Sequence, residues 1–258
     1  YSVTECTVVS TESASNSLIT GMTLSCAPGT YMATFNAQHT GKESQAFSSS
    51  SGVLDLVEIY DDLIGFPGGV SHAVTFGSGE ILSPGVYDVA GAASISGTLT
   101  LDGGGDSSSV FIIRCTGAFS AAANSTVILQ GDAEARNVFW VATGTSSALT
   151  VSEYSSIKGN LVSNSGAISM AANTSLKGRM FTKTGAVSVG ANSVLTIPSG
   201  DSPIDLGIIS SFVMFSTNGA ITSDGTSIVN GDLGNASGAI TIAGDHYGES
   251  FPAGTQSI

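Results

Sequence analysis

The sequence is poor in charge. Asp, Glu, Lys and Arg make up 10% of its 258 residues, whereas ~25% is typical of soluble proteins. Seven residues are Lys or Arg and 20 are Asp or Glu, which gives a formal net charge of −13 at pH 7. Nucleic acids and anionic membrane surfaces are bound through clusters of Lys and Arg. We therefore expect neither as a partner of this protein.

Long apolar runs are missing as well. None reaches the ~18 residues that a membrane-spanning helix requires, so we expect nothing in this sequence to cross a membrane. The first residues carry no pattern of a signal peptide, and we expect Tyr1 to begin a mature chain.

Cysteine is rare, with Cys6, Cys26 and Cys115 as its three occurrences. An odd number leaves at least one thiol unpaired in a monomer. Cys6 and Cys26 lie in one block and a bridge between them is as consistent with the spacing as two free thiols, because spacing alone does not establish the geometry. Cys115 follows the apolar run 110–113, so we expect a small buried thiol there. The acidity and the candidate bridge favour a secreted, extracellular protein.

Clustered carboxylates, on which polysaccharide-cleaving solenoid enzymes depend, are sparse in the repetitive part of the chain. No acid occurs between Glu153 and Asp201. The pair Asp61-Asp62 falls on a predicted helix, where a solvated face is the better interpretation. We also find no nucleophile elbow and no phosphate-binding loop, so we expect no enzyme.

Candidate metal ligands are scarce too. His39, His72 and His246 have no Cys or carboxylate at the spacing of a metal site. The stretch 102–106, Asp-Gly-Gly-Gly-Asp, resembles a calcium-binding turn but occurs once, and a plain glycine-rich turn is the better interpretation. We expect neither a metal nor any other cofactor.

What the chain has instead is a repeat. Ala148, Ala167 and Ala186 open equivalent segments that are 19 residues apart, and Ala220 and Ala239 repeat the same step. A short fixed period is the signature of a solenoid, whose coils stack on their neighbours. Each repeat holds short runs that alternate between apolar and polar residues, separated by Gly, Ser and Asn, so the coils are predicted to consist of strands. The fold class is therefore an all-β solenoid.

One helix is predicted, over residues 43–64, and Gly65 to Gly69 end it. It is too short to be stable alone, and the run 137–141 is apolar on both faces. We therefore expect the helix to cover the outer side of that run. Its apolar stripe consists of Leu54, Val57, Ile59, Tyr60, Leu63 and Ile64.

The remaining chain divides around the repeats. We expect one domain over 1–258, with a cap and a partial coil in 1–42, main coils in 80–198 and terminal coils in 205–258. A cap is needed because an open solenoid end exposes a strand edge and apolar core. The apolar run 208–215 is predicted to be a strand.

Several motifs in 80–198 resemble those of the microbial ice-binding protein family. They are Leu-Ser-Pro-Gly-Val-Tyr at 82–87, Gly-Thr-Leu-Thr-Leu-Asp-Gly-Gly-Gly-Asp at 97–106, Val-Phe-Ile at 110–112, Asn-Val-Phe-Trp at 137–140, Gly-Arg-Met at 178–180 and Thr-Gly-Ala-Val at 184–187. The resemblance implies an irregular right-handed β-helix with one α-helix packed alongside. It also implies an antifreeze function, with thermal hysteresis and inhibition of ice recrystallisation.

One segment departs from the family order. Residues 205–235 resemble the coil with which the family usually begins, yet here they stand near the end of the sequence. A circular permutation explains this, because the segment can fill the place of a missing first coil, and we prefer it. The alternative is the start of a second, truncated copy.

The repeated strand predicts the binding face. If Ile168 and Met170 point inward, Ala167 and Ser169 point outward, because side chains alternate along a strand. Six coils at ~4.8 Å spacing give a face of about 30 Å, although a register slip of one residue reverses every assignment. The predicted outward residues are Ala118, Ser120, Ala148, Thr150, Ala167, Ser169, Ala186, Ser188, Ala220, Thr222, Ala239 and Thr241.

Two interpretations of this face compete. Small uncharged residues are ordinary on a solenoid surface. With the resemblance, the better interpretation is a rigid array of methyl and hydroxyl groups that orders water and merges with an ice crystal surface. We expect a monomer that adsorbs to ice. The alternatives are an adhesin or carbohydrate-binding module, which requires aromatic platforms although the chain has one Trp, and a polysaccharide lyase or hydrolase, which requires a carboxylate cluster.

Overall fold

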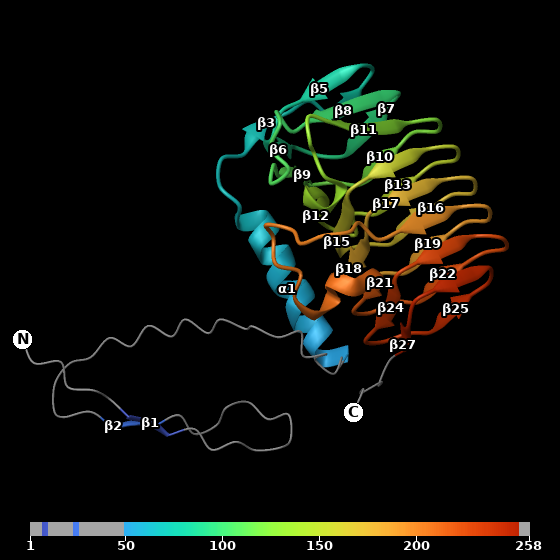
Figure 1. Ribbon diagram of the computed structural model, residues 1–258. Coiled ribbons are helices and arrows are strands. Elements are labelled where there is room, and N and C mark those ends of the chain that lie inside the picture. The colour runs from blue at the N-terminus through green and yellow to red at the C-terminus, as the bar shows by residue number, and fades with distance from the viewer. Residues whose placement is uncertain (1–6, 10–22, 26–48, 253–258) are drawn as a thin grey trace, which may run out of the picture. The chain divides into compact units, whose positions relative to one another are not determined.

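A computed structural model of the protein describes residues 7–9, 23–25 and 49–252 (Figure 1). The chain forms two compact units, Tyr1–Ser44 and Gln45–Ile258. In the described part of the first unit, β1 (Thr7–Val9) pairs antiparallel with β2 (Thr23–Ser25). The predicted Cys6–Cys26 bridge and, apart from this ribbon, the predicted cap lie outside the described residues.

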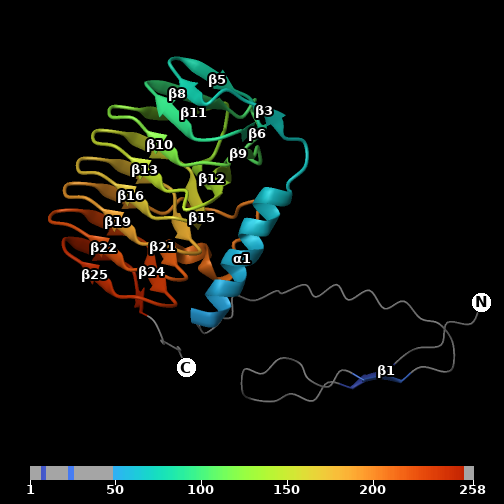
Figure 2. The same cartoon turned by 180° about the vertical axis from the view of Figure 1, so that it is seen from behind.

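The second unit is a β-helix. Each turn of the chain places one strand on each of three parallel sheets, which we call the first, second and third wall in the order in which a turn visits them (Figures 1 and 2). The walls stack their strands in chain order, so neighbouring coils are neighbours in sequence. The predicted all-β solenoid is confirmed.

Within the described residues the first wall has eight strands and the second wall eight. The first wall consists of β4 (Thr75–Gly77), β7 (Ala93–Ser96), β10 (Phe119–Ala121), β13 (Leu149–Val151), β16 (Ile168–Met170), β19 (Val187–Val189), β22 (Ile221–Ser223) and β25 (Ile240–Ile242). The second wall consists of β5 (Glu80–Leu82), β8 (Thr98–Asp102), β11 (Thr126–Gln130), β14 (Ser156–Lys158), β17 (Ser175–Lys177), β20 (Val194–Thr196), β23 (Ile228–Asn230) and β26 (Asp245–Tyr247).

The third wall has nine described strands. They are β3 (Val70–Ser71), β6 (Gly85–Val89), β9 (Phe111–Cys115), β12 (Val138–Thr145), β15 (Asn160–Ser165), β18 (Met180–Thr182), β21 (Phe212–Ser216), β24 (Asp232–Asn235) and β27 (Ser250–Phe251). Two 3-10 helices, η1 (Ala135–Asn137) and η2 (Gly207–Ser211), interrupt the coils. The 19-residue period corresponds to one coil without such an insertion.

The core lies between the walls. In each strand of the first wall the inward side chains alternate with partly exposed ones; Leu149, Ile168 and Val187, for example, have no exposed surface and stack on one another. Cys115 is a buried free thiol, as expected, and burial raises its pKa to about 11. The inward face is thus continuous from coil to coil, which fixes the register that the sequence left open to a slip.

Helix α1 (Ser49–Gly65) packs along the outer side of the third wall. In Figures 1 and 2 it lies lengthwise beside this wall, with its first turn near the level of β27, and a loop leads from its last turn to β3. The predicted helix covered 43–64, of which 43–48 lie outside the described residues. As expected, it covers the run 137–141, where Phe139 and Val141 are buried against it.

The predicted apolar stripe of this helix was partly wrong. The buried hydrophobic residues are Leu56, Ile59, Tyr60 and Leu63, which follow the i, i+3, i+4, i+7 spacing of one helical face. Leu54 is 69% exposed and Ile64 is 41% exposed. A stripe that is apolar over more than half of the helix does not show which of its residues face the wall.

The strand predicted over 208–215 was also wrong in its first half. The chain forms η2 there and becomes a strand at Phe212. The Asp55 carboxylate accepts a hydrogen bond from the backbone N–H of Ile208 at 2.6 Å, and Arg179 donates to the Ser210 carbonyl at 2.7 Å. Ile209 is buried beneath the helix, so this apolar run serves the helix interface rather than a sheet.

The turns after the first wall favour residues that adopt a left-handed backbone. Asn124, Asn173 and Asn192 occupy equivalent turns with φ of 63°, 59° and 56°, and Tyr154 occupies the same turn with φ of 61°. Asn adopts this region readily, whereas other side chains pay ~1–2 kcal/mol. Tyr154 is also 61% exposed, so little packing is lost when it is removed.

Tyr154→Asn is therefore expected to stabilise the protein by about 1 kcal/mol. Thermal unfolding of the two proteins under identical conditions measures this difference. The reciprocal change Asn192→Tyr serves as control and should lower the melting temperature. A Tyr154→Asn protein that melts at or below the parent temperature contradicts the prediction.

Candidate functional site

A line of hydroxyl side chains crosses the whole first wall. Each strand holds one such Ser or Thr, which is the first residue of β4, the second of β7 and the middle residue of the other six, and strand pairing places each opposite the next. None of these residues is buried, whereas most of their neighbours in sequence point into the core. We call this line the hydroxyl rank: Thr75, Ser94, Ser120, Thr150, Ser169, Ser188, Thr222 and Thr241.

A second line lies two residues earlier in every coil. Backbone hydrogen bonds join these positions to the ladder; Leu149 N–H donates to Ala167 O, and Ile168 N–H to Ala186 O, both at 2.9 Å. Every one of these residues is alanine and none is buried. We call this line the alanine rank: Ala73, Ala92, Ala118, Ala148, Ala167, Ala186, Ala220 and Ala239.

All twelve residues predicted for the face lie in these two ranks. The structure adds the coils of Ala73 and Thr75 and of Ala92 and Ser94, which sequence reasoning missed. It missed them because 26 residues separate Ser94 from Ser120, so the 19-residue step does not connect these two coils to the later ones. The pattern Ala-x-Ser/Thr with its step of 19 residues, from Thr75 to Ser94, carries the signal. Counted in the same way as the six coils above, eight strands at ~4.8 Å give a face of about 38 Å.

The hydroxyl rank is available to water. Within the described part of the chain, the Ser94 hydroxyl donates to Thr75 Oγ1 at 3.4 Å, and the other six hydroxyls of the rank make no hydrogen bond to a protein group. A surface hydroxyl that lacks a protein partner bonds to water. The face therefore presents rows of hydroxyls that hold water, beside rows of methyl groups that do not.

The two ranks carry no charge, and the other walls differ in this respect. Lys158 and Lys177 stand side by side on the outer face of the second wall. Burial, and then the charge of Lys177, lowers the pKa of Lys158. Helix α1 covers much of the third wall. Of the three described walls, the first is the one that is both open and free of charged side chains along its length.

Aromatic platforms are missing from this face. Trp140 has no exposed surface, its ring lies 5.1 Å from that of Phe119 inside the core, and its indole N–H donates to Lys158 O at 2.9 Å. The tryptophan is therefore part of the core, and it offers no surface for stacking on a sugar.

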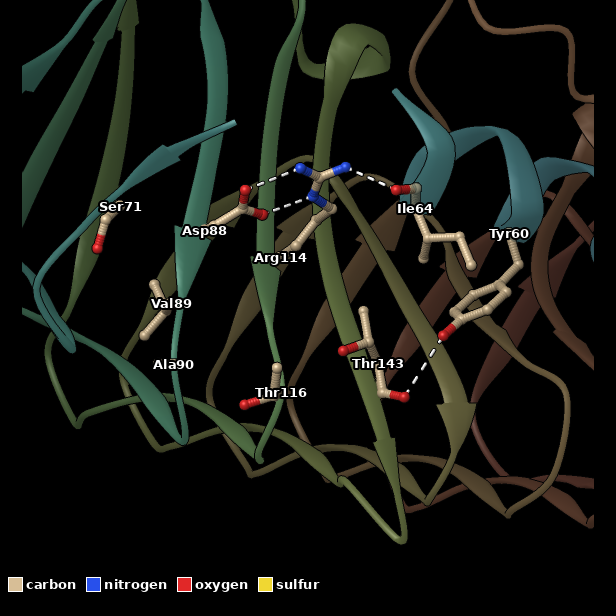
Figure 3. A pocket seen from close by; sticks show the side chains of 9 residues that line it. All are labelled: Tyr60, Ile64, Ser71, Asp88, Val89, Ala90, Arg114, Thr116 and Thr143. Carbon is tan, nitrogen blue, oxygen red and sulfur yellow. Dashed lines mark hydrogen bonds and ion pairs between the residues drawn. The ribbon is translucent and has the colours of Figure 1, made fainter. Parts of the chain in front are cut away.

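A hollow of about 580 Å³ lies beside the end of α1, over the third wall (Figure 3). The charged side chains that line it, Asp88 and Arg114, already bind protein groups. Arg114 binds Asp88 through Nε at 2.7 Å and Nη2 at 2.9 Å, while Nη1 donates to the carbonyls of Ile64 and Phe66 at 2.7 and 2.9 Å. A guanidinium at the last carbonyls of a helix satisfies acceptors that the helix leaves free. This cluster fastens the helix to the wall.

Two further structural findings concern the alternatives. Within 49–252 and the short ribbon, no group of three or more His, Cys, Asp or Glu residues is placed to hold a metal ion. In the same residues, no helix is long and apolar enough to cross a membrane.

Comparison with known proteins points to one family. A family model described as Ice-binding-like matches residues 6–195. An ice-binding protein of Flavobacterium frigoris (strain PS1) is 31% identical over 88 residues, which cover 34% of this chain and 30% of that protein.

Solved structures agree with this match. An ice-binding protein from an Antarctic bacterium of the Flavobacteriaceae is 34% identical, with a TM-score of 0.52 over 80% of this chain and 50% of that one. An ice-binding protein domain of Shewanella frigidimarina is 26% identical, with a TM-score of 0.54 over 58% of this chain and 63% of that one. The chain thus spans about half the length of the first of these structures and under a third of the curated relative.

Proposed function

Because the chain belongs to the Ice-binding-like family, we propose that it adsorbs to ice through the first wall. The observation that carries the proposal is the pair of ranks: eight alanines and eight hydroxyl residues in register, uncharged and at least partly exposed, on a ladder of backbone hydrogen bonds. The family supports ice as the ligand, and the ranks support this wall as the surface.

The mechanism requires no bond chemistry. Hydroxyls at the ~4.8 Å spacing of the strands each hold a water molecule, and the alanine methyl groups between them leave the neighbouring waters to bond to one another. The backbone ladder holds the groups in place, so little entropy is lost when the ordered layer joins a crystal. Long charged side chains are mobile and strongly hydrated, and they would disrupt such a layer.

Adsorption of this kind changes crystal growth. Ice between bound molecules grows as a curved surface, which lowers the freezing temperature below the melting temperature. We propose that the protein produces thermal hysteresis and inhibits recrystallisation. We further propose that it acts as a secreted monomer, since ice forms outside cells and one copy presents both ranks. The terminal coils 205–258 then extend this face as permuted coils.

A single ice crystal held in dilute protein during slow cooling tests the proposal. We expect a faceted crystal that stops growing within a temperature gap and then grows abruptly. Bovine serum albumin at the same concentration is the control, in which the crystal should grow as a smooth disc. A smooth disc in the presence of the folded protein would falsify ice binding.

A further inference from the structure

Buried hydroxyls line both edges of the first wall. They do not face solvent, and the alternation that identified the ranks does not predict them. They lie inside the two corners of the coil, where the chain enters the first wall from the third and where it leaves the first wall for the second.

At the entry corner, a polar side chain holds the residue that precedes the alanine rank. Ser163 Oγ donates to Ser147 O at 3.1 Å, Thr182 Oγ1 to Gly166 O at 2.9 Å and Ser216 Oγ to Gly185 O at 2.9 Å. All three donors have no exposed surface, and strand pairing stacks them in one column. The next residues along the chain from these acceptors are Ala148, Ala167 and Ala186, three consecutive members of the alanine rank.

At the exit corner, a similar column holds the residues that follow the hydroxyl rank. Ser125 Oγ donates to Ile95 O at 3.0 Å, Ser155 Oγ to Ala122 O at 2.8 Å and Ser193 Oγ to Ala171 O at 3.0 Å. These serines are at most 2% exposed. Each bond joins one coil to the preceding one, so the column ties successive turns together.

We infer that these buried hydroxyls are positioning residues for the ice-adsorbing face. At the entry corner each carbonyl accepts no second hydrogen bond from the described part of the chain, so the side chain that donates to it sets its orientation. At the exit corner each carbonyl also accepts a bond from a backbone N–H or from the Thr174 hydroxyl, so the serine reinforces an edge that is already held. The peptide plane of Gly166 carries Ala167 on its other side, and fixing the carbonyl therefore fixes where the alanine methyl stands. With both edges of the first wall held in place, the two ranks between them stay flat and in register. The inference rests on the proposed adsorption through the first wall.

Thr182 allows a matched test, because valine keeps its shape and serine keeps its hydroxyl. We expect Thr182→Val to lose several-fold in thermal hysteresis at equal concentration, and Thr182→Ser to keep the parent value although it leaves a methyl-sized gap. Ser216→Ala is the second variant, for the case in which Thr182→Val folds poorly. Ser109→Ala is the control, because that serine also donates to a carbonyl, Gly103 O at 2.8 Å, but at a turn away from the ranks.

Amide hydrogen exchange of Gly166 and Ile168, measured in the absence of ice, reports how firmly this edge of the face is held. Both N–H groups donate to the next coil, at 2.6 and 2.9 Å. Thr182→Val should exchange there about tenfold faster, the factor that loss of one buried hydrogen bond gives, and Thr182→Ser should not. If hysteresis and exchange follow packing, so that Thr182→Ser loses as much as Thr182→Val, the hydroxyls are structural and the inference is wrong. If the parent protein shows no hysteresis, the proposed function fails, while the exchange rates still decide whether the hydroxyl positions this edge.

Discussion

Replacing Ala167 with tyrosine is expected to remove most of the thermal hysteresis. Ala167 is exposed at the middle of the alanine rank, between Ala148 and Ala186. A phenol ring at this position stands above the plane of both ranks and holds the central coils away from the crystal. A loss of ~1.4 kcal/mol in adsorption free energy is a factor of ten in affinity. We expect a decrease of about tenfold or more in the concentration-dependent activity, measured on single crystals.

The matched control is Thr100→Tyr. Thr100 is partly exposed, points outward from the second wall and belongs to the same stack. Thr100→Tyr adds the same phenol ring, but on a strand outside the proposed face, so the thermal hysteresis of this variant should equal that of the parent. Circular dichroism and thermal unfolding show whether both variants are folded. A folded Ala167→Tyr protein with parental hysteresis would place the adsorbing surface on another wall.

The contrast between these two positions explains why the face could be predicted from the sequence. The first wall repeats one residue class at each outward position, because every coil meets the same surroundings there. From Ala118 to Thr241 the pattern alone places twelve outward residues. The second wall has no such repetition, with Lys158, Thr196 and Tyr247 at equivalent positions. Where a position does not have the same surroundings in every coil, the sequence shows no repeat at that position.

The first two coils show the limit of that argument. Ala73 and Ala92 occupy the same place as Ala167 and are 19 residues apart, but 26 residues separate Ala92 from Ala118. A preceding glycine does not mark the rank either, because Gly91 precedes Ala92 whereas His72 precedes Ala73 and Ser147 precedes Ala148. The longer connection between Ala92 and Ala118 thus interrupts the period, while the outward alanine remains in both coils.

The segments between coils were harder to predict, for a different reason. The run 208–215 is apolar throughout, and a strand and a buried 3-10 turn place similar demands on composition. What decides between them is the contact of Ile208 with Asp55, over 150 positions earlier in the chain. Contacts between distant parts of the sequence leave no local pattern. The buried hydroxyl columns were missed for the same reason, since a Ser that bonds inward looks like a Ser in any turn.

Leu56→Ala is expected to destabilise the protein by about 2–5 kcal/mol, the cost of removing a fully buried leucine. Leu56 has no exposed surface and belongs to the cluster that joins α1 to Phe139 and Phe181 of the third wall. Leu54→Ala, on the same helix, removes the same atoms from a side chain that is 69% exposed, and should change stability by no more than ~0.5 kcal/mol. Urea unfolding followed by circular dichroism measures both. Equal losses would mean that the helix sits on the wall through a different face. A loss confined to Leu56→Ala, with parental hysteresis at temperatures where the variant is folded, would show that the helix stabilises the stack and takes no part in contact with ice.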